Sequence, residues 1–395
     1  MKQVIYFDAD DANIKQFETH QTISKGTLIS ASIADIHFPV NNIGPKMQFT
    51  ILDEQFLQKI EYLPKLDVVY VLGDLYEHKV LASSDAMLYA NMFIGKLIEL
   101  CKQKSSTLII IQGTLSHDAN QLKSYYHYMY DPSVDVRVIT RPQFEYVKNA
   151  RILCLPEMYG MDESIYQQLL HRSGFYDMAI MHGMFAGAVA GNEVGSSRLF
   201  HIEDFDNCNG PILAGHVHMQ MCLKDHFYYC GPPYQWKFDD EGKKGFMLTA
   251  LNLDTRQYYA DWIEIKSFVY KTISIQELTH TDPQVMITYI DRLKREKGID
   301  YLRVKFNLSI GAVFKMILSN NYKDNSNVKL EFPKTEEEIM LRQQEEQISA
   351  DMEKYKFILD SKSSDEEKFC TFLNLLKEDE NYITVDELIQ LLGEV

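Results

Sequence analysis

The stretch "TLISASIADIH", residues 27–37, combines the two patterns that decide the fold. Residues 27–34 form a short, mainly apolar run, and this run passes directly into Asp35 and His37. An apolar run of this length that ends in a polar turn is typical of a strand buried on both faces of a sheet. The pattern predicts a strand that carries a carboxylate and an imidazole at its C-terminal end.

Runs of the same kind recur along the chain. They lie at 66–73, 106–113, 150–156, 176–183 and 210–216. A long helix is expected at 83–104, which begins with serines and ends with lysines. After residue 222, "HFYYCG" and "KGFMLTALNL" lack helical spacers and predict antiparallel strands. Strands that alternate with helices in this way predict an α/β sandwich.

Length and composition limit the class of protein. A chain of 395 residues is too long for one ordinary core and is expected to form two or three domains. The N-terminus turns acidic within eight residues, and no apolar stretch is long enough to cross a bilayer, so a cytoplasmic location without membrane contact is expected. The six cysteines form no C-x-x-C pair, which argues against a zinc knuckle or a disulfide framework.

The charge is distributed unevenly along the chain. The net charge is −16, yet residues 265–335 hold 12 Lys and Arg against 7 Asp and Glu. Residues 336–395 hold 6 against 17. Because phosphate binding requires lysine and arginine, the net charge argues against nucleic acid as a partner, whereas the basic segment is compatible with it. Alone, the uneven distribution supports no more than chance variation on solvated surfaces.

Composition and periodicity also predict the domain organisation. The expected parts are an N-terminal extension (1–26), an α/β domain (27–264), a small basic α+β domain (265–334), a charged linker (335–362) and a C-terminal helix pair (363–395). Within residues 265–334, the sequence predicts helices at 283–297 and 311–319 and strands at 301–309 and 327–332. Each helix of the terminal pair opens with a capping box, and the second has an apolar stripe.

Five predicted strand ends carry side chains of the kinds that bind metal ions. In chain order these are Asp35 and His37; Asp74; Ser116, His117 and Asp118; His182; and His216 and His218. Alone, a D-x-H, G-D or H-G motif is more typical of a turn, whereas two histidines two residues apart, such as His216 and His218, are unusual without a metal. Because strand ends of an open α/β sheet converge on one crevice, the ordered set instead favours a metal site. Carboxylates with imidazoles suit Mn²⁺, Fe²⁺ or Zn²⁺, and two such ions can support phosphate ester hydrolysis.

The ordered set resembles the calcineurin-like metallophosphoesterase superfamily, whose pattern is D-x-H, G-D, G-N-H-D, H and G-H-x-H. The likeness covers roughly residues 27–264 and implies that they form a catalytic domain with a four-layer α/β sandwich, with residues 265–334 as its cap. Within the superfamily, the chain looks most like the SbcD-type nuclease subunits of DNA-repair complexes, including bacteriophage relatives. Residues 231–251, "GPPYQWKFDDEGKKGFMLTAL", resemble the strand pair that follows the metal site in these nucleases.

The resemblance implies two divalent metal ions, with Mn²⁺ preferred. The ligands it implies are Asp35, His37 and His218 for one ion and His182 and His216 for the other, with Asp74 as the bridge. His117 would protonate the leaving oxygen or stabilise the transition state, and Asp118 would orient His117. Tyr76, Glu77 and His78 are either further substrate-placing residues or ordinary loop residues.

The third motif departs from the superfamily pattern. G-N-H-D is replaced by G-T-L-S-H-D, so two residues are inserted and Ser116 is expected in the place of the asparagine. A serine hydroxyl is a weaker neutral ligand than an amide oxygen, which predicts weaker binding of the second ion. Because His117 and Asp118 are intact, a working enzyme is favoured over a pseudoenzyme.

The resemblance further implies DNA and an SMC-like coiled-coil ATPase of the SbcC type as partners, together with a homodimer. The residues expected to contact DNA are Arg292, Lys294, Arg295 and Lys297. Those expected to contact the ATPase are Phe369, Phe372, Leu376, Val385, Leu388, Ile389 and Leu392. The preferred function is a Mn²⁺-dependent DNA exo- or endonuclease. The alternatives are a phosphomonoesterase or cyclic-nucleotide phosphodiesterase on the same scaffold, and a scaffold without catalytic activity.

Overall fold

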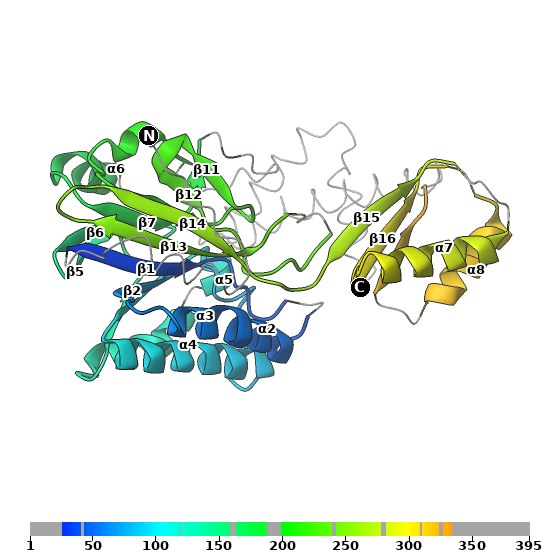
Figure 1. Ribbon diagram of the computed structural model, residues 1–395, viewed down its shortest axis with the longest axis horizontal. Helices are drawn as coiled ribbons and strands as arrows, with labels where there is room; N and C mark the ends of the chain where they lie inside the picture. Colours follow the sequence, from blue (N-terminus) through cyan, green and yellow to red (C-terminus); the bar gives the residue numbers. More distant parts are fainter. Residues whose placement is uncertain are drawn as a thin grey trace, which may run out of the picture. The chain divides into compact units, whose positions relative to one another are not determined.

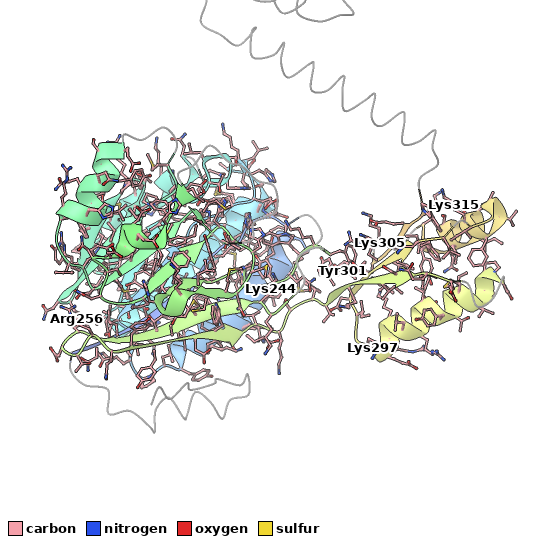
Figure 2. The ribbon with its side chains drawn as sticks, turned by 90° about the horizontal axis from the view of Figure 1, so that it is seen from above. Lys244, Arg256, Lys297, Tyr301, Lys305 and Lys315 are labelled. Atoms are coloured by element: carbon pink, nitrogen blue, oxygen red, sulfur yellow. The ribbon has the colours of Figure 1, made fainter. Side chains whose placement is uncertain are left out.

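The computed structural model describes residues 26–333 except 41–42, 119, 159–162, 187, 189–198, 239–241, 278–281, 309 and 324–326. The first of two six-stranded sheets has the order β14-β13-β1-β2-β3-β4. Its strands are β1 (Thr27–Ile33), β2 (Val68–Leu72), β3 (Thr107–Ile111), β4 (Asp135–Ile139), β13 (Gly245–Asn252) and β14 (Tyr258–Glu264). β1 to β4 are parallel, whereas β13 pairs antiparallel with both β1 and β14. Arg256 lies in the turn between β13 and β14 and has a positive φ (Figure 2).

The second sheet has the order β11-β12-β10-β7-β6-β5. Its strands are β5 (Gln143–Val147), β6 (Ala150–Leu155), β7 (Met178–His182), β10 (Ile212–Gly215), β11 (Met221–Leu223) and β12 (Phe227–Tyr229). β6, β7, β10 and β12 run parallel to their neighbours within this group. The antiparallel arrangement expected after residue 222 is therefore wrong for the pairing of β12 with β10, although β12 is antiparallel to β11.

Side-chain alternation along the parallel strands builds the core in layers. In β2, Val69 and Val71 pack on one face with residues of the helices, while Tyr70 packs on the other face with Ile152 and Met178 of the second sheet. A third apolar cluster covers the outer face of the second sheet. Each central strand is buried on both faces, which is why these strands read as continuous apolar runs. The predicted α/β class is confirmed.

Helices cover the outer face of the first sheet. These are α2 (Pro45–Leu52), α3 (Gln58–Glu61) and α4 (Asp85–Lys104), which lie along that face in Figure 1. α4 confirms the helix expected at 83–104, because the Ser84 hydroxyl accepts a hydrogen bond from the backbone of Met87 at its start. Ser105 ends α4 in the left-handed conformation. Within the described ranges, no helix is long and apolar enough to cross a membrane.

Shorter elements complete this part of the chain. They are the helical turns η1 (Asp53–Leu57), α5 (Leu115–Asp118), η2 (Gln121–Tyr130), α6 (Glu163–Gln167), η3 (Gln168–Arg172), η4 (Ile202–Phe205) and η5 (Lys224–His226), with the short strands β8 (Met184–Phe185) and β9 (Leu199–Phe200). α5 matters most for the site, because it follows β3 directly and carries His117.

The segment expected to form the cap contains a three-stranded sheet with the order β15-β16-β17. Its elements are β15 (Tyr270–Ile275), α7 (Pro283–Glu296), β16 (Tyr301–Phe306), α8 (Ala312–Tyr322) and β17 (Val328–Glu331). The two helices and the last two strands match the sequence prediction, whereas β15 was not predicted. In the described part of the chain, one compact unit contains residues up to 273 with 282–304 and 318–329; the other contains 274–277, 305–317 and 330–333. The segment 265–334 therefore contributes to both units.

Candidate metal centre

The parallel strands of both sheets deliver the predicted metal-binding side chains at their C-terminal ends. Asp35 and His37 follow β1, and Asp74 follows β2. His182 is the last residue of β7, and β7 and β10 are neighbours in the second sheet. His216 and His218 follow β10. The strand ends are therefore the reason that residues distant in sequence come together.

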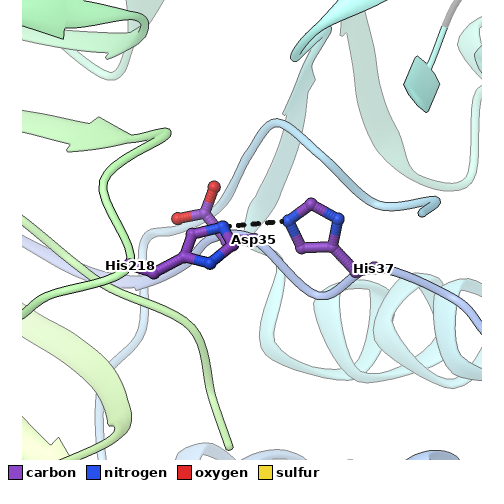
Figure 3. Close-up of side chains that lie close together, drawn as sticks. All are labelled: Asp35, His37 and His218. Carbon is purple, nitrogen blue, oxygen red and sulfur yellow. Dashed lines mark hydrogen bonds between the residues drawn. The ribbon is translucent and has the colours of Figure 1, made fainter. Parts of the chain in front are cut away.

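The first group of possible ligands consists of Asp35, His37 and His218 (Figure 3). One ligand atom from each residue lies within 4.8 Å of the others. The Nε2 atoms of His37 and His218 are 3.2 Å apart. Two imidazole nitrogens that face each other at this distance can share a proton or bind a common cation. The side chain of Trp236 packs edge-on against both rings, with centroid distances of 4.6 and 4.9 Å.

The second group consists of Asp74, His182 and His216. The Nε2 atom of His182 lies 3.2 Å from Asp74 Oδ2 and 3.3 Å from His216 Nδ1. His182 Nδ1 lies 2.7 Å from the carbonyl oxygen of Leu72. Because a carbonyl can only accept, Nδ1 carries a proton and Nε2 faces the other ligands. Such a hydrogen bond is the usual way to fix the tautomer of a metal-binding histidine.

Asp74 connects the two groups. A third set of possible ligands contains His37, Asp74 and His117, again within 4.8 Å. Asp74 Oδ2 is 3.9 Å from His37 Nε2, which belongs to the first group. The bridging position expected for Asp74 is therefore geometrically reasonable. These buried aspartate and histidine groups could hold a metal ion.

Backbone strain is concentrated at the same positions. Among the described residues, nine other than glycine have positive φ, and four of them are Asp35, His37, Asp74 and His216. Residues other than glycine avoid this region because of steric repulsion. Strain of this kind persists only where the surrounding structure imposes it, and it gathers at functional sites.

Three glycines allow the strand ends to approach closely. A Cβ atom on Gly113 would lie 2.2 Å from Asp74 Oδ1 and from the Asp74 backbone nitrogen. A Cβ atom on Gly215 would lie 2.3 Å from the carbonyl oxygen of Leu72 and 2.8 Å from His182 Nδ1. Gly73 combines a similar approach to His182 with a φ of 85°. The sequence places glycine here because the ligands occupy the space of a side chain.

Asp35 provides the test of whether a cation fits. The side chain is fully buried, and its Oδ1 atom accepts a hydrogen bond of 2.8 Å from the backbone of His216. Within the described residues, Oδ2 is buried without a hydrogen-bond partner. Burial, with a contribution from the Asp74 carboxylate, raises the pKa of Asp35 to about 6. A buried carboxylate oxygen that lacks a donor is suited to a divalent cation.

The other ligands show strong mutual electrostatic effects. Burial opposes the ionisation of Asp74, but His182 and His37 outweigh burial and hold the pKa of Asp74 well below its ordinary value. Burial likewise opposes protonation of His182, and Asp74 outweighs it and raises the pKa of His182. For His218, burial lowers the pKa to about 2, with His37 and Lys237 adding to the effect. His218 is therefore neutral and able to donate a lone pair.

The contacts of His117 and Asp118 differ from those expected. His117 Nδ1 donates to the backbone carbonyl of Glu77, so Glu77 rather than Asp118 orients the ring. The buried Asp118 carboxylate accepts hydrogen bonds from the backbone of Gly113 (2.8 Å) and Tyr76 (3.2 Å). Asp118 therefore stabilises the two turns that carry Asp74 and His117. Burial and the nearby Asp74 raise the pKa of Asp118 to about 7.

The structure places Thr114, not Ser116, beside the ligands. Ser116 is exposed on α5, which corrects the expectation that it takes the asparagine's place. Thr114 follows Gly113 directly, and its backbone N–H donates to Asp74 Oδ1 at 2.6 Å. Its hydroxyl lies 3.2 Å from Asp74 Oδ2 and 3.1 Å from Glu157 Oε2. The two additional residues form the start of α5 instead of displacing the residue after the glycine.

Two residues near the site, Trp236 and Glu157, were not assigned a role from the sequence, and a third, Glu77, was only a candidate for placing the substrate. Trp236 and Glu157 gave no signal beyond an aromatic residue in a strand-like stretch and an acid after a proline. Glu77 had a weak signal, because it follows Asp74 closely in the chain. Its Oε2 atom lies 2.7 Å from His37 Nδ1, so it fixes the orientation of that ring.

The remaining predicted residues lie away from this cluster in the sequence. Arg292, Lys294 and Arg295 are on α7, and Lys297 is its C-cap. Arg292 and Lys297 are exposed, and Arg292 Nε is 4.0 Å from Glu296 Oε2. The linker at 335–362, the helix pair at 363–395 and residues 1–25 of the expected extension lie outside the described residues, and so do all the residues expected to contact an ATPase.

No family model and no curated protein sequence matches this chain. The resemblance to calcineurin-like metallophosphoesterases therefore rests on the order of the five motifs. The proximity of the aspartate and histidine side chains does not depend on that resemblance, because it follows from the fold itself.

Proposed function

We propose that this chain is a metal-dependent phosphodiesterase that cleaves DNA, of the SbcD type within the calcineurin-like superfamily. The observation that carries the proposal is the pair of buried ligand groups linked through Asp74, with His117 beside them. The ordered motifs at successive strand ends support it independently. On this proposal, the two sheets and their covering helices are a metallophosphoesterase sandwich, and the segment after residue 265 is a cap.

The ligand groups would hold two divalent cations, with Mn²⁺ preferred. When bound, two such ions supply Lewis acidity to a phosphate and lower the pKa of an attacking water. Asp35, His37 and His218 would hold one ion, and His182 and His216 the other. Asp74 would contribute to both sites, because its carboxylate lies within reach of both groups.

His117 would transfer a proton at the leaving oxygen or stabilise the transition state. Its Nδ1 atom is held by the Glu77 carbonyl, which leaves Nε2 to act toward the substrate. The ring packs edge-on against His37 with a centroid distance of 5.0 Å. A positioned histidine of this kind contributes about 10²- to 10⁴-fold to a rate. Glu77 is a positioning residue in this scheme, because its side chain holds His37 and its backbone holds His117.

The basic residues after position 265 are the proposed contact with the DNA backbone. Lys297 is exposed at the C-terminal end of α7, and Figure 2 also labels Lys305 on β16 and Lys315 on α8. Lysine and arginine bind phosphates without reading the sequence. Residues 363–395 are proposed to bind the coiled coil of an SMC-like ATPase in a DNA-repair or recombination complex, and the working assembly is proposed to be a homodimer.

The test is a comparison of substrates with the purified full-length chain. Single-stranded DNA, duplex DNA, an aryl phosphodiester, an aryl phosphomonoester and a cyclic nucleotide are each incubated with Mn²⁺, with and without chelator. Cleavage of DNA and the aryl diester, abolished by chelator, is expected. Asp74→Asn should remove this activity. Asp53→Asn is the matched control, because Asp53 forms a surface ion pair with Lys96.

The other outcomes identify the alternatives. Hydrolysis of the monoester or the cyclic nucleotide without DNA cleavage would overturn the nuclease assignment while retaining the phosphoesterase site. A chain that binds Mn²⁺ and hydrolyses nothing would be a scaffold without catalytic activity.

A further inference from the structure

A buried carboxylate outside the five motifs lies against the second ligand group. Glu157 follows β6 and Pro156, and it is 3% exposed. Its backbone N–H donates to the carbonyl oxygen of Gln112, at the end of β3, at a distance of 3.2 Å. This bond ties the end of β6, in the second sheet, to the end of β3, in the first. The backbone from which the Glu157 side chain extends is therefore held in place by both sheets.

The carboxylate of Glu157 contacts both histidines of that group. Its Oε2 atom is 3.3 Å from His216 Nδ1 and 3.6 Å from His182 Nε2. The Thr114 hydroxyl links it to Asp74, at 3.1 Å from Glu157 Oε2 and 3.2 Å from Asp74 Oδ2. Two carboxylates and two imidazoles thus converge on one small volume.

Two arrangements satisfy these contacts. His182 already has its Nδ1 proton on the Leu72 carbonyl, so its Nε2 atom faces Asp74 and Glu157 either with a second proton or with a lone pair. In the first case, an imidazolium forms an ion pair with the carboxylates. In the second case, if His216 Nδ1 is also unprotonated, lone pairs of all four side chains face one another, and a cation among them is required.

We infer that Glu157 is a ligand of the metal ion held by Asp74, His182 and His216, and that Thr114 fixes the relative position of the two carboxylates. A cation is preferred over an imidazolium because of the other charged groups around the site. Asp35 accepts a hydrogen bond from the backbone of His216, its Oδ2 atom has no partner among the described residues, and it adds a further buried carboxylate. A single imidazolium cannot compensate all of these charges, whereas divalent ions can. Carboxylate ligands also favour Mn²⁺ over softer ions.

This inference rests on the metal-binding part of the proposed function, so the experiment measures binding rather than catalysis. Mn²⁺ is titrated into the chelator-treated full-length chain by calorimetry, and free Mn²⁺ is followed by electron paramagnetic resonance. The wild type is expected to bind two ions. Glu157→Gln is expected to lower the affinity for one of the two ions by about 10-fold or more. Replacing even a residue that only hydrogen-bonds a metal ligand lowers metal affinity by ~10–100-fold. The other ion should bind unchanged.

Glu99→Gln is the matched control, because it removes the same charge from an exposed position on α4. Both Mn²⁺ sites should be unaffected in this variant. Thermal unfolding of the metal-free proteins separates a ligand from an ion-pair partner. A ligand leaves an uncompensated charge in the metal-free state, so Glu157→Gln should raise or preserve the melting temperature without metal and reduce the increase caused by Mn²⁺.

Unchanged affinity for both ions in Glu157→Gln, together with a lower melting temperature without metal, would assign Glu157 to a structural ion pair and overturn the inference. If Glu157→Gln does not fold, Glu157→Asp decides, because it keeps the charge and withdraws the carboxylate by one methylene. Wild-type Mn²⁺ affinity in Glu157→Asp would count against a ligand role, and a selective loss of one ion would support it. A wild-type chain that binds no Mn²⁺ would instead refute the proposed metal centre as a whole.

Discussion

Replacement of Asp35 by asparagine should stabilise the metal-free protein at neutral pH while removing its response to Mn²⁺. Burial raises the pKa of Asp35 from its ordinary value of 3.8 to about 6 in the folded protein. A difference of this size corresponds to about 3 kcal/mol of folding free energy. The folded state binds the proton more tightly than the unfolded state. The destabilisation of the folded protein by the ionised Asp35 carboxylate is therefore absent below pH 3.8, grows between pH 3.8 and 6, and is complete above pH 6.

Asp35→Asn removes this penalty and keeps an oxygen for the backbone N–H of His216. The new amide nitrogen takes the position of Oδ2, where a group without a partner costs about 1–3 kcal/mol. The net gain at pH 7.5 is therefore expected to be about 0–2 kcal/mol. At pH 5 only about half of the penalty remains in the wild type, so the advantage of the variant should shrink by about 1.5 kcal/mol.

Urea unfolding in the presence of chelator, at pH 5 and pH 7.5, measures this difference. Tryptophan fluorescence is a suitable signal, because Trp236 packs against His37 and His218. Asp53→Asn controls for the loss of a surface carboxylate. An Asp35→Asn variant whose stability relative to the wild type is the same at both pH values would refute the reasoning. So would a variant that retains the full stabilisation by Mn²⁺.

Three further predictions concern the turn after β3 and the basic residues. His117→Asn should lower kcat by about 10²- to 10⁴-fold and leave Mn²⁺ affinity nearly unchanged, and an equal loss of both would assign His117 to the ligands. Gly113→Ala should abolish Mn²⁺ binding in calorimetry, because its Cβ atom would lie 2.2 Å from Asp74 Oδ1; normal binding would show that the turn can shift. Neutralising the four basic residues should reduce the slope of log DNA affinity against log salt concentration by about 0.7–0.9 for each lost phosphate contact. Hydrolysis of a small aryl diester should not change. An unaltered slope would show that DNA binds elsewhere. These residues are Arg292, Lys294, Arg295 and Lys297.

The strands and the possible metal ligands that follow them could be predicted from the sequence for a common physical reason. A strand buried on both faces must be apolar throughout, so its end is marked by the first polar residue, as at Asp35 after β1 and Asp74 after β2. β4, β5 and β15 are less completely buried, and because they mix polar with apolar residues the sequence did not identify them as strands. In the two six-stranded sheets, the sequence therefore reveals the strands that are buried most completely.

The contacts around the third motif could not be predicted in the same way. Counting back from His117 aligns Ser116 with the asparagine of the G-N-H-D motif. In the structure, however, the two additional residues lie at the start of α5, and Thr114 directly follows Gly113. Glu157 was missed because its role depends on the pairing of β6 with β7, which brings it next to His182. Periodicity describes single strands and carries no information on which strand ends become neighbours.

The strand ends that carry the possible ligands lower the stability of the metal-free protein and at the same time give it the capacity to bind a cation. Asp35, His37, Asp74 and His216 all have positive φ, and such residues cost about 1–3 kcal/mol each. The unpartnered oxygen of Asp35 adds to that cost. The apolar strands that precede these residues are buried on both faces, and their packing is what holds the ligands in place. A cation that binds only the folded state recovers part of this free energy, so metal affinity and folding stability are linked through the same few residues. A substitution that relaxes the strand ends would therefore be expected to stabilise the empty protein and weaken its hold on metal together.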